Sequence, residues 1–140
     1  MEGEFKSELT IEALDENLKA VQQFVRDSVR RICSDNQTLL QLDLVVEEVF
    51  VNISHYAYAP GTGTATVICT VCNNPASLIM TFIDSGKPFN PLKRPDPDIT
   101  LGAEDRDIGG LGIFLVKKYM SSTEYNYADG KNIFTLTRKF

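Results

Sequence analysis

Two turn signals, each lying between a pair of strand-like runs, constrain the fold of this chain more than any other feature. Asn73-Asn74-Pro75 separates a threonine- and valine-rich run at 63–72 from a short apolar run at 78–83. Asp129-Gly130 separates two further runs near the carboxyl end, and this dipeptide is a strong hairpin signal. Hairpins join antiparallel neighbours, so the chain differs from one built of repeated strand–helix–strand units.

The remaining elements follow from hydrophobic periodicity. Residues 5–12 alternate as a half-buried strand does, whereas 14–32 and 38–56 repeat apolar residues at helical spacing. A third helix is predicted over 113–120. We therefore predict a single α+β domain covering residues 1–140. Its architecture is a two-layer α/β sandwich, with a mixed, mostly antiparallel sheet and helices packed on one face.

Composition and charge argue against some classes of function. The chain is 43% hydrophobic and 24% charged, and its net charge of -5 argues against nonspecific binding to nucleic acid or anionic membrane. It has neither a membrane-length apolar run nor a secretory signal, so we expect a cytoplasmic protein. Cys69 and Cys72 form a C-x-x-C inside a strand-like run, where positions three apart point to opposite faces. We expect ordinary buried thiols there, with no zinc or redox site.

Polar residues interrupt the otherwise apolar helix predicted at 38–56. Glu48 and Asn52 are four residues apart and His55 is three further on, so all three project from one face. Burying an unpaired carboxylate on such a helix would be costly. Two interpretations stay open at this point: this edge of the helix faces water, or a ligand covers it.

Glycines accompany two further motifs. Asp84 ends an apolar strand, where its carboxylate can accept a hydrogen bond from an exocyclic amine such as that of adenine. Gly86, two residues later, permits close approach of a ligand, although an ordinary turn has the same pattern. Gly109, Gly110 and Gly112 lead into the third predicted helix. Backbone N–H groups at a helix amino terminus favour phosphate, and a flexible hinge is the alternative.

Taken in order, these motifs resemble those of the GHKL ATPase superfamily: E-x-x-x-N on a helix, D-x-G after a strand, and G-G-x-G before a helix. The stretches N-I-S-H-Y-A-Y, D-S-G-K-P-F-N-P and G-G-L-G-I-F-L-V are similar to those of its small bacterial members, anti-sigma factors that act as serine/threonine protein kinases. Nearly the whole chain matches that group in length and element order. The resemblance implies a Bergerat-type ATP-binding fold, with a mobile ATP lid at about 87–109.

The resemblance also implies roles for residues on the helix and the strand. Glu48 would be the general base that activates water or a substrate hydroxyl. Asn52 would ligate Mg²⁺ bridging the phosphates, and His55 would stand in the nucleotide site where relatives often have lysine. Asp84 would read the adenine amine, and Gly86 would make room for the base. Hard oxygen ligands suit Mg²⁺, and phosphoryl transfer needs mainly positioning and charge neutralisation.

Further roles fall on the glycine motif and the segment before it. Gly109, Gly110, Leu111 and Gly112 would bind the ATP phosphates, chiefly through backbone N–H groups. Arg106 would contact a partner protein, because some anti-sigma kinases carry a partner-touching arginine just before this motif.

The implied function is an ATP- and Mg²⁺-dependent serine/threonine kinase. It would phosphorylate a small antagonist protein of the anti-anti-sigma type and regulate a sigma factor or similar partner, without binding nucleic acid or membrane. Homodimerisation is left open. The alternative is a non-catalytic, nucleotide-gated protein-binding module of the same fold. A sensor histidine kinase fragment is set aside, because the single histidine lies inside the implied nucleotide site.

Overall fold

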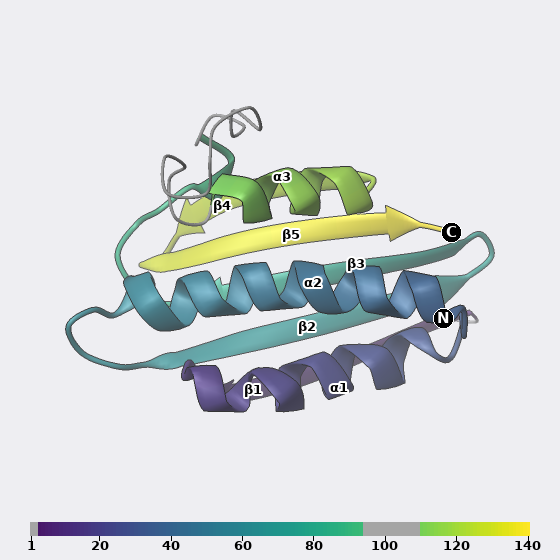
Figure 1. Ribbon diagram of the computed structural model, residues 1–140, viewed down its shortest axis with the longest axis horizontal. Helices are drawn as coiled ribbons and strands as arrows, with labels where there is room; N and C mark the ends of the chain where they lie inside the picture. Colours follow the sequence, from purple (N-terminus) through teal and green to yellow (C-terminus); the bar gives the residue numbers. More distant parts are fainter. Residues whose placement is uncertain (1–2, 94–109) are drawn as a thin grey trace.

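The computed structural model describes residues 3–93 and 110–140 as a sheet covered by helices (Figure 1). The described elements, in chain order, are β1 (Glu4–Glu12), the 3₁₀ turn η1 (Asp15–Asn17), α1 (Leu18–Val29), α2 (Asn36–Asn52), the π-helical η2 (Ile53–Ala57), β2 (Thr64–Asn73), β3 (Ala76–Asp84), the 3₁₀ turn η3 (Pro91–Lys93), α3 (Gly110–Tyr119), β4 (Ser122–Ala128) and β5 (Lys131–Lys139). Both predicted hairpins and all three predicted helices are present. The predicted lid at 87–109 falls largely outside the described residues.

The sheet has five strands in the order β1-β2-β3-β5-β4, and every pairing between them is antiparallel. The expected mixed sheet is therefore antiparallel throughout its described strands. After β3, α3 returns the chain across the sheet and β4 comes back, so β5 runs opposite to β3 (Figure 1). Asp129 (φ 55°) and Gly130 (φ 76°) turn the last hairpin, as the positive φ angles of a two-residue turn require.

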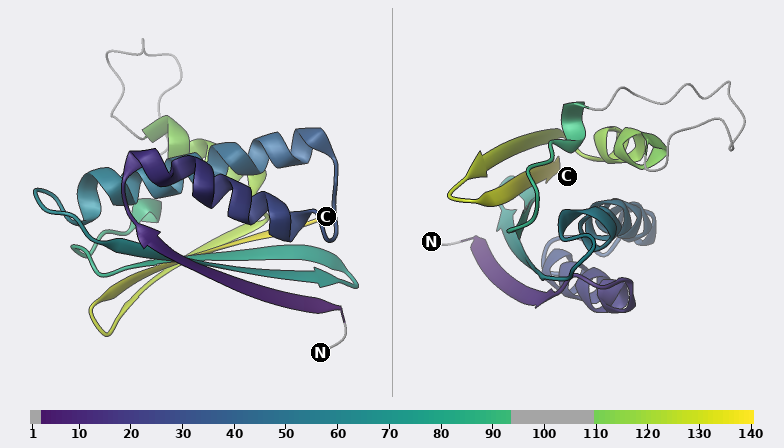
Figure 2. Two further views of the ribbon diagram at one scale, coloured as in Figure 1. Left: turned by 90° about the horizontal axis from the view of Figure 1, so that it is seen from below. Right: turned by 90° about the vertical axis from the view of Figure 1, so that its left-hand side faces the viewer.

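The helices α1, α2 and α3 of the described residues lie on one face of the sheet, as Figure 2 shows from the side and from the end. α2 lies between α1 and α3 and is the most buried of the three, because apolar residues occupy most of its circumference. α1 is amphipathic and buries Val21, Val25 and Val29, which recur every four residues. Together with the inward side chains of β2, β3 and β5, these faces form one hydrophobic core.

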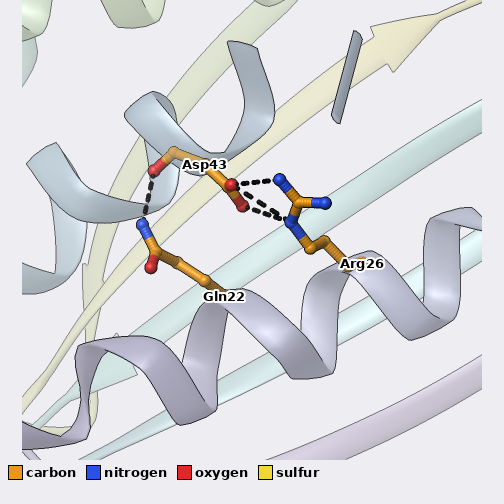
Figure 3. A network of polar contacts seen from close by, with 3 residues as sticks. All are labelled: Gln22, Arg26 and Asp43. Carbon is orange, nitrogen blue, oxygen red and sulfur yellow. Dashed lines mark hydrogen bonds and ion pairs between the residues drawn. The ribbon is translucent and has the colours of Figure 1, made fainter. Parts of the chain in front are cut away.

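A polar contact holds α1 against α2 (Figure 3). The Arg26 guanidinium donates through Nε and Nη2 to the Asp43 carboxylate, and Gln22 Nε2 donates to the Asp43 carbonyl at 3.1 Å. The ion pair is about four-fifths buried, with side chains 23% and 22% exposed. At the start of α2, Asp35 accepts from the Thr38 N–H at 3.0 Å and caps the helix.

The two cysteines of the C-x-x-C point to opposite faces of β2. Cys69 is fully buried in the core and Cys72 is half-buried on the other face, and both are free thiols. Burial raises the pKa of Cys69 to about 12, so its reactive thiolate form is suppressed at neutral pH. The expected burial is confirmed for Cys69, whereas Cys72 is less buried than expected.

Candidate functional site

A cavity of about 360 Å³ opens where the carboxyl end of α2, the amino end of α3 and the start of β5 meet, at the left-hand end of the molecule in Figure 1. Much of its lining is apolar and comes from α2, η2, β3, α3 and β5: Val49, Ile53, Phe82, Ile113 and Phe134. Polar side chains enter from two sides. We call Asp84 and Asn132 the sheet-side wall, and Glu48 and Asn52 the helix-side wall.

Buried polar groups of the sheet-side wall are joined by hydrogen bonds. Asp84 and Asn132 are only 7% and 6% exposed, and they face each other as register partners on β3 and β5. Asp84 Oδ1 accepts from Asn132 Nδ2 at 2.9 Å and from the Gly86 N–H at 2.9 Å. Within residues 3–93 and 110–140 its second oxygen, Oδ2, has no hydrogen-bond partner. A buried carboxylate oxygen left in this state at a cavity wall suits a ligand that donates a hydrogen bond.

The turn after Asp84 packs directly against the end of η2. A Cβ added to Gly86 would lie 2.2 Å from the carbonyl oxygen of Ala57, which is closer than real Cβ contacts come. The Lys87 N–H donates to that same carbonyl at 2.9 Å, and the Ser85 N–H donates to Tyr58 Oη at 2.8 Å. Glycine is therefore required here by the protein's own backbone, whereas the sequence suggested that it makes room for a ligand.

Both residues of the helix-side wall line the cavity from the last turns of α2. Asn52 Nδ2 donates to Glu48 Oε1 at 3.2 Å, and both side chains are half-buried. This arrangement comes from their four-residue spacing on one helix face. This edge of α2 borders a cavity and not bulk water alone, and its coverage by a ligand stays a prediction. The Asn52 carbonyl oxygen is the type of hard ligand that Mg²⁺ prefers.

His55 lies apart from the cavity lining in the described part of the chain. Its Nε2 is 2.6 Å from Asp15 Oδ2, and Ser54 Oγ donates to Asp15 Oδ1. Hydrogen bonds from His55 and then Ser54 lower the pKa of Asp15 below its usual range. The contact joins η1 to η2 on an exposed surface, since the two side chains of the pair are 47% and 58% exposed. His55 is therefore placed with η1, beside the predicted site and outside its cavity.

The glycine motif forms the first turn of α3, which begins three residues earlier than predicted. Gly110, Leu111 and Gly112 are its first three residues, and the N–H groups of a first helical turn have no acceptor within their own helix. Ile113, next in the chain, lines the cavity. Gly109 and Arg106, which the sequence also assigned to the site, lie outside the described residues.

Sequence reasoning missed Asn132 and Tyr125, which both line the cavity. A signal for Asn132 was present, because residues 132, 134 and 136 alternate with half-buried positions in β5 and the latter two are apolar. A polar residue in the buried phase of a strand indicates a partner. That partner, Asp84, lies 48 residues away in the chain.

Comparisons with known proteins give a family model, a curated relative and a solved structure that resemble this chain. The family model of the histidine kinase-like ATPase domain matches residues 11–138. The serine/threonine-protein kinase BtrW of Bordetella bronchiseptica is 28% identical over 96 residues, which cover 69% of this chain and 67% of BtrW. The crystal structure of the RsbU and RsbW domains of a Mycobacterium tuberculosis protein matches with a TM-score of 0.66 at 15% identity. That match covers 96% of this chain but only 32% of the solved chain, and it concerns the fold alone.

Proposed function

Because the chain belongs to the histidine kinase-like ATPase domain family, we propose that it binds ATP in the cavity and transfers the γ-phosphoryl group to a serine or threonine of a partner protein. The observation that carries this proposal is the meeting, at one cavity, of Glu48 and Asn52 from α2 with Asp84 from β3. The family resemblance assigned these three residues to one site, although Glu48 and Asp84 are 36 positions apart in the sequence. No helix within residues 3–93 and 110–140 is long and apolar enough to cross a membrane.

The adenine ring is proposed to lie against the sheet-side wall. Asp84 Oδ2 accepts a hydrogen bond from its exocyclic amine, since Oδ1 is already occupied by Asn132 and Gly86. Apolar side chains such as Phe82 and Ile53 exclude water around the ring, which strengthens this hydrogen bond. Gly86 contributes by letting the turn approach η2 closely.

The phosphates are proposed to extend toward the helix-side wall and the first turn of α3. Mg²⁺, when bound, neutralises phosphate charge, and Asn52 Oδ1 is its proposed protein ligand. Backbone N–H groups of Gly110, Leu111 and Gly112 donate to phosphate oxygens. Glu48 takes the proton of the attacking serine or threonine hydroxyl. The hydroxyl oxygen bonds to the γ-phosphorus, the bond from phosphorus to the β–γ bridging oxygen breaks, and ADP leaves with that electron pair.

The proposed protein substrate is a small antagonist of the anti-anti-sigma type, and the regulated partner is a sigma factor or similar regulator of transcription. Support comes from the named kinase activity of BtrW and from the fold shared with the RsbW domain. The ATP lid at 87–109 and the partner contact of Arg106 remain part of this proposal, as does a cytoplasmic location.

Incubation with γ-labelled ATP, MgCl₂ and purified antagonist-type proteins of the same cell tests the proposal. Label on a serine or threonine of one of them is the expected result. ATP binding is measured in parallel by calorimetry, so that binding and transfer are scored separately. Binding without transfer to any of these proteins would replace the kinase by the nucleotide-gated binding module. Absence of binding would overturn both functions.

A further inference from the structure

Asn132 uses its entire hydrogen-bonding capacity on four different partners. Its Nδ2 donates to Asp84 Oδ1 at 2.9 Å and to the Lys87 carbonyl at 2.8 Å. Its Oδ1 accepts from the Phe89 N–H at 3.0 Å and from the Tyr125 hydroxyl. A primary amide has two N–H donors and two acceptor lone pairs, so each is matched once. Such a fully satisfied buried amide has one preferred orientation, because rotating it would break all four bonds.

One of these contacts restricts Asp84, and two restrict the chain that follows it. The bond to Asp84 Oδ1, together with that from the Gly86 N–H, occupies one carboxylate oxygen and sets the rotation of the carboxyl group. The bonds to the Lys87 carbonyl and the Phe89 N–H attach residues 87–89 to β5. These residues border the same cavity. One side chain thus orients the proposed base-reading carboxylate and holds the adjacent cavity rim.

We propose that Asn132 is a positioning residue for nucleotide recognition. It turns Asp84 so that Oδ2 faces the exocyclic amine of the adenine ring, and it anchors residues 87–89 beside that ring. This role rests on the proposed function, because it needs a purine base in the cavity. Asn132 touches none of the reacting groups in this assignment; it acts through Asp84 and through the backbone of the rim.

A purely structural role for Asn132 makes a different prediction from a positioning role. A structural residue stabilises the fold, so its loss lowers the affinity for every ligand of the cavity by the same factor. A positioning residue orients one hydrogen-bond acceptor toward one donor of the ligand. Its loss therefore lowers the affinity specifically for the ligand that carries this donor. Purine riboside 5′-triphosphate is the discriminating probe, because it is ATP without the exocyclic amine.

The experiment measures dissociation constants of ATP and purine riboside 5′-triphosphate, both with MgCl₂, by calorimetry. The unaltered protein is expected to bind ATP roughly tenfold or more tightly than the analogue, the usual effect of one hydrogen bond to a charged acceptor. In Asn132→Ala and Asn132→Ser this ratio is expected to fall toward one. Asn126→Ala is the matched control, because Asn126 is an exposed asparagine on β4 outside the cavity lining of the described residues.

The outcomes separate failure of the positioning role of Asn132 from failure of the proposed function. A ratio preserved in both Asn132 variants, within about twofold, overturns the positioning role and leaves ATP binding intact. If the unaltered protein binds both nucleotides equally well, the proposed contact between Asp84 and adenine is wrong. The proposed role of Asn132 in orienting Asp84 is then wrong as well. Failure of the unaltered protein to bind either nucleotide overturns the proposed function itself.

Hydrogen exchange without nucleotide tests the anchoring independently of any ligand. The Phe89 amide donates to Asn132 Oδ1, so its exchange is expected to become faster in Asn132→Ser and to stay unchanged in Asn126→Ala. Serine serves here because its shorter side chain cannot reach Phe89 and its hydroxyl can still pair with a neighbour in the site. Equal Phe89 exchange in the unaltered protein and Asn132→Ser would overturn the anchoring role, whatever the nucleotide results.

Discussion

The sheet-side and helix-side walls of the cavity are built by different means. Asp84 and Asn132 are more than nine-tenths buried and belong to a hydrogen-bonded network that includes backbone groups. Glu48 and Asn52 are half-buried and share one bond of 3.2 Å, on the last turns of a helix that continues as a π-helix. The sheet-side wall is therefore held by buried hydrogen bonds that include backbone groups, whereas the helix-side wall consists of half-buried side chains near the end of a helix.

This difference matches what each wall is proposed to contact. An adenine ring is rigid, and a pre-oriented acceptor recognises it at little further cost in entropy. The γ-phosphoryl group is the part of ATP that reacts, and it is proposed to lie beside the helix-side wall. Substitutions on the sheet-side wall should therefore act on affinity, and those on the helix-side wall should act on turnover.

The largest expected effect is on the helix-side wall. Glu48→Gln should lower phosphoryl transfer roughly 100-fold or more, the usual contribution of a general base, and should leave ATP affinity largely unchanged. Glu47→Gln is the matched control, because Glu47 is the neighbouring glutamate of α2 and is exposed to solvent. Single-turnover transfer and calorimetric ATP binding give the two readouts. Transfer at the parental rate in the Glu48 variant would assign the base to another residue.

On the sheet-side wall the effect should appear in binding. Asp84→Asn should lower the affinity for ATP roughly tenfold or more. An amide has one acceptor oxygen where the carboxylate has two, and hydrogen bonds to a charged acceptor are stronger than those to a neutral one. Asp129→Asn, at the exposed turn between β4 and β5, is the same chemical change outside the cavity lining described here. Saturating ATP should restore transfer in the Asp84 variant. A lowered rate at saturation would show that the two walls are not functionally separate.

The turn that follows Asp84 should respond through stability. Gly86→Ala places a methyl group against the Ala57 carbonyl, at 2.2 Å before any shift, so the turn or η2 must move. We expect a loss of about 1–3 kcal/mol in the free energy of unfolding, as for other overpacked sites. Gly61→Ala is the control, because the nearest atom to its added Cβ is 3.4 Å away. Equal urea midpoints for the two variants would contradict the close packing at Gly86.

The two walls were not equally predictable from the sequence. That Glu48 and Asn52 share one helix face follows from helical spacing, since both lie on a regular part of α2, whereas their roles were implied by the family resemblance. Asp84 was found at the end of an apolar strand, but its partner Asn132 depends on a strand pairing that spans 48 residues. Long-range pairing is not contained in local periodicity, and this is also why the sheet was expected to be mixed.

His55 shows a second limit of reasoning from spacing. Three residues beyond Asn52, it would share the face of Asn52 on a continuous α-helix. The chain instead changes to a π-helix from Ile53 to Ala57, and a wider helix rotates the following side chains by a smaller angle per residue. His55 then reaches Asp15 on η1. No local residue pattern announced that change of helix type.

The smallest expected effect concerns this contact beside the helix-side wall. Hydrogen bonds from His55 and then Ser54 lower the pKa of Asp15 from its usual value of 3.8. A lowered carboxyl pKa in the folded state stabilises the fold fully above that usual value, and this stabilisation is lost as pH falls through the lowered pKa. Asp15→Asn should therefore melt at a slightly lower temperature than the unaltered protein at about pH 6, and the difference should vanish once the pH falls below the lowered pKa of Asp15.

The same variant also decides where the helix-side wall ends. Because the contact between Asp15 and His55 is exposed and lies outside the described cavity lining, Asp15→Asn should leave ATP affinity within about twofold. Asp27→Asn is the control for the melting series, since Asp27 is an exposed aspartate of α1 that accepts from Gln23. A difference in melting temperature that persists at low pH would mean that Asp15 acts through packing. A large loss of ATP affinity would extend the helix-side wall to η1 and return His55 to the nucleotide site that its sequence position suggested.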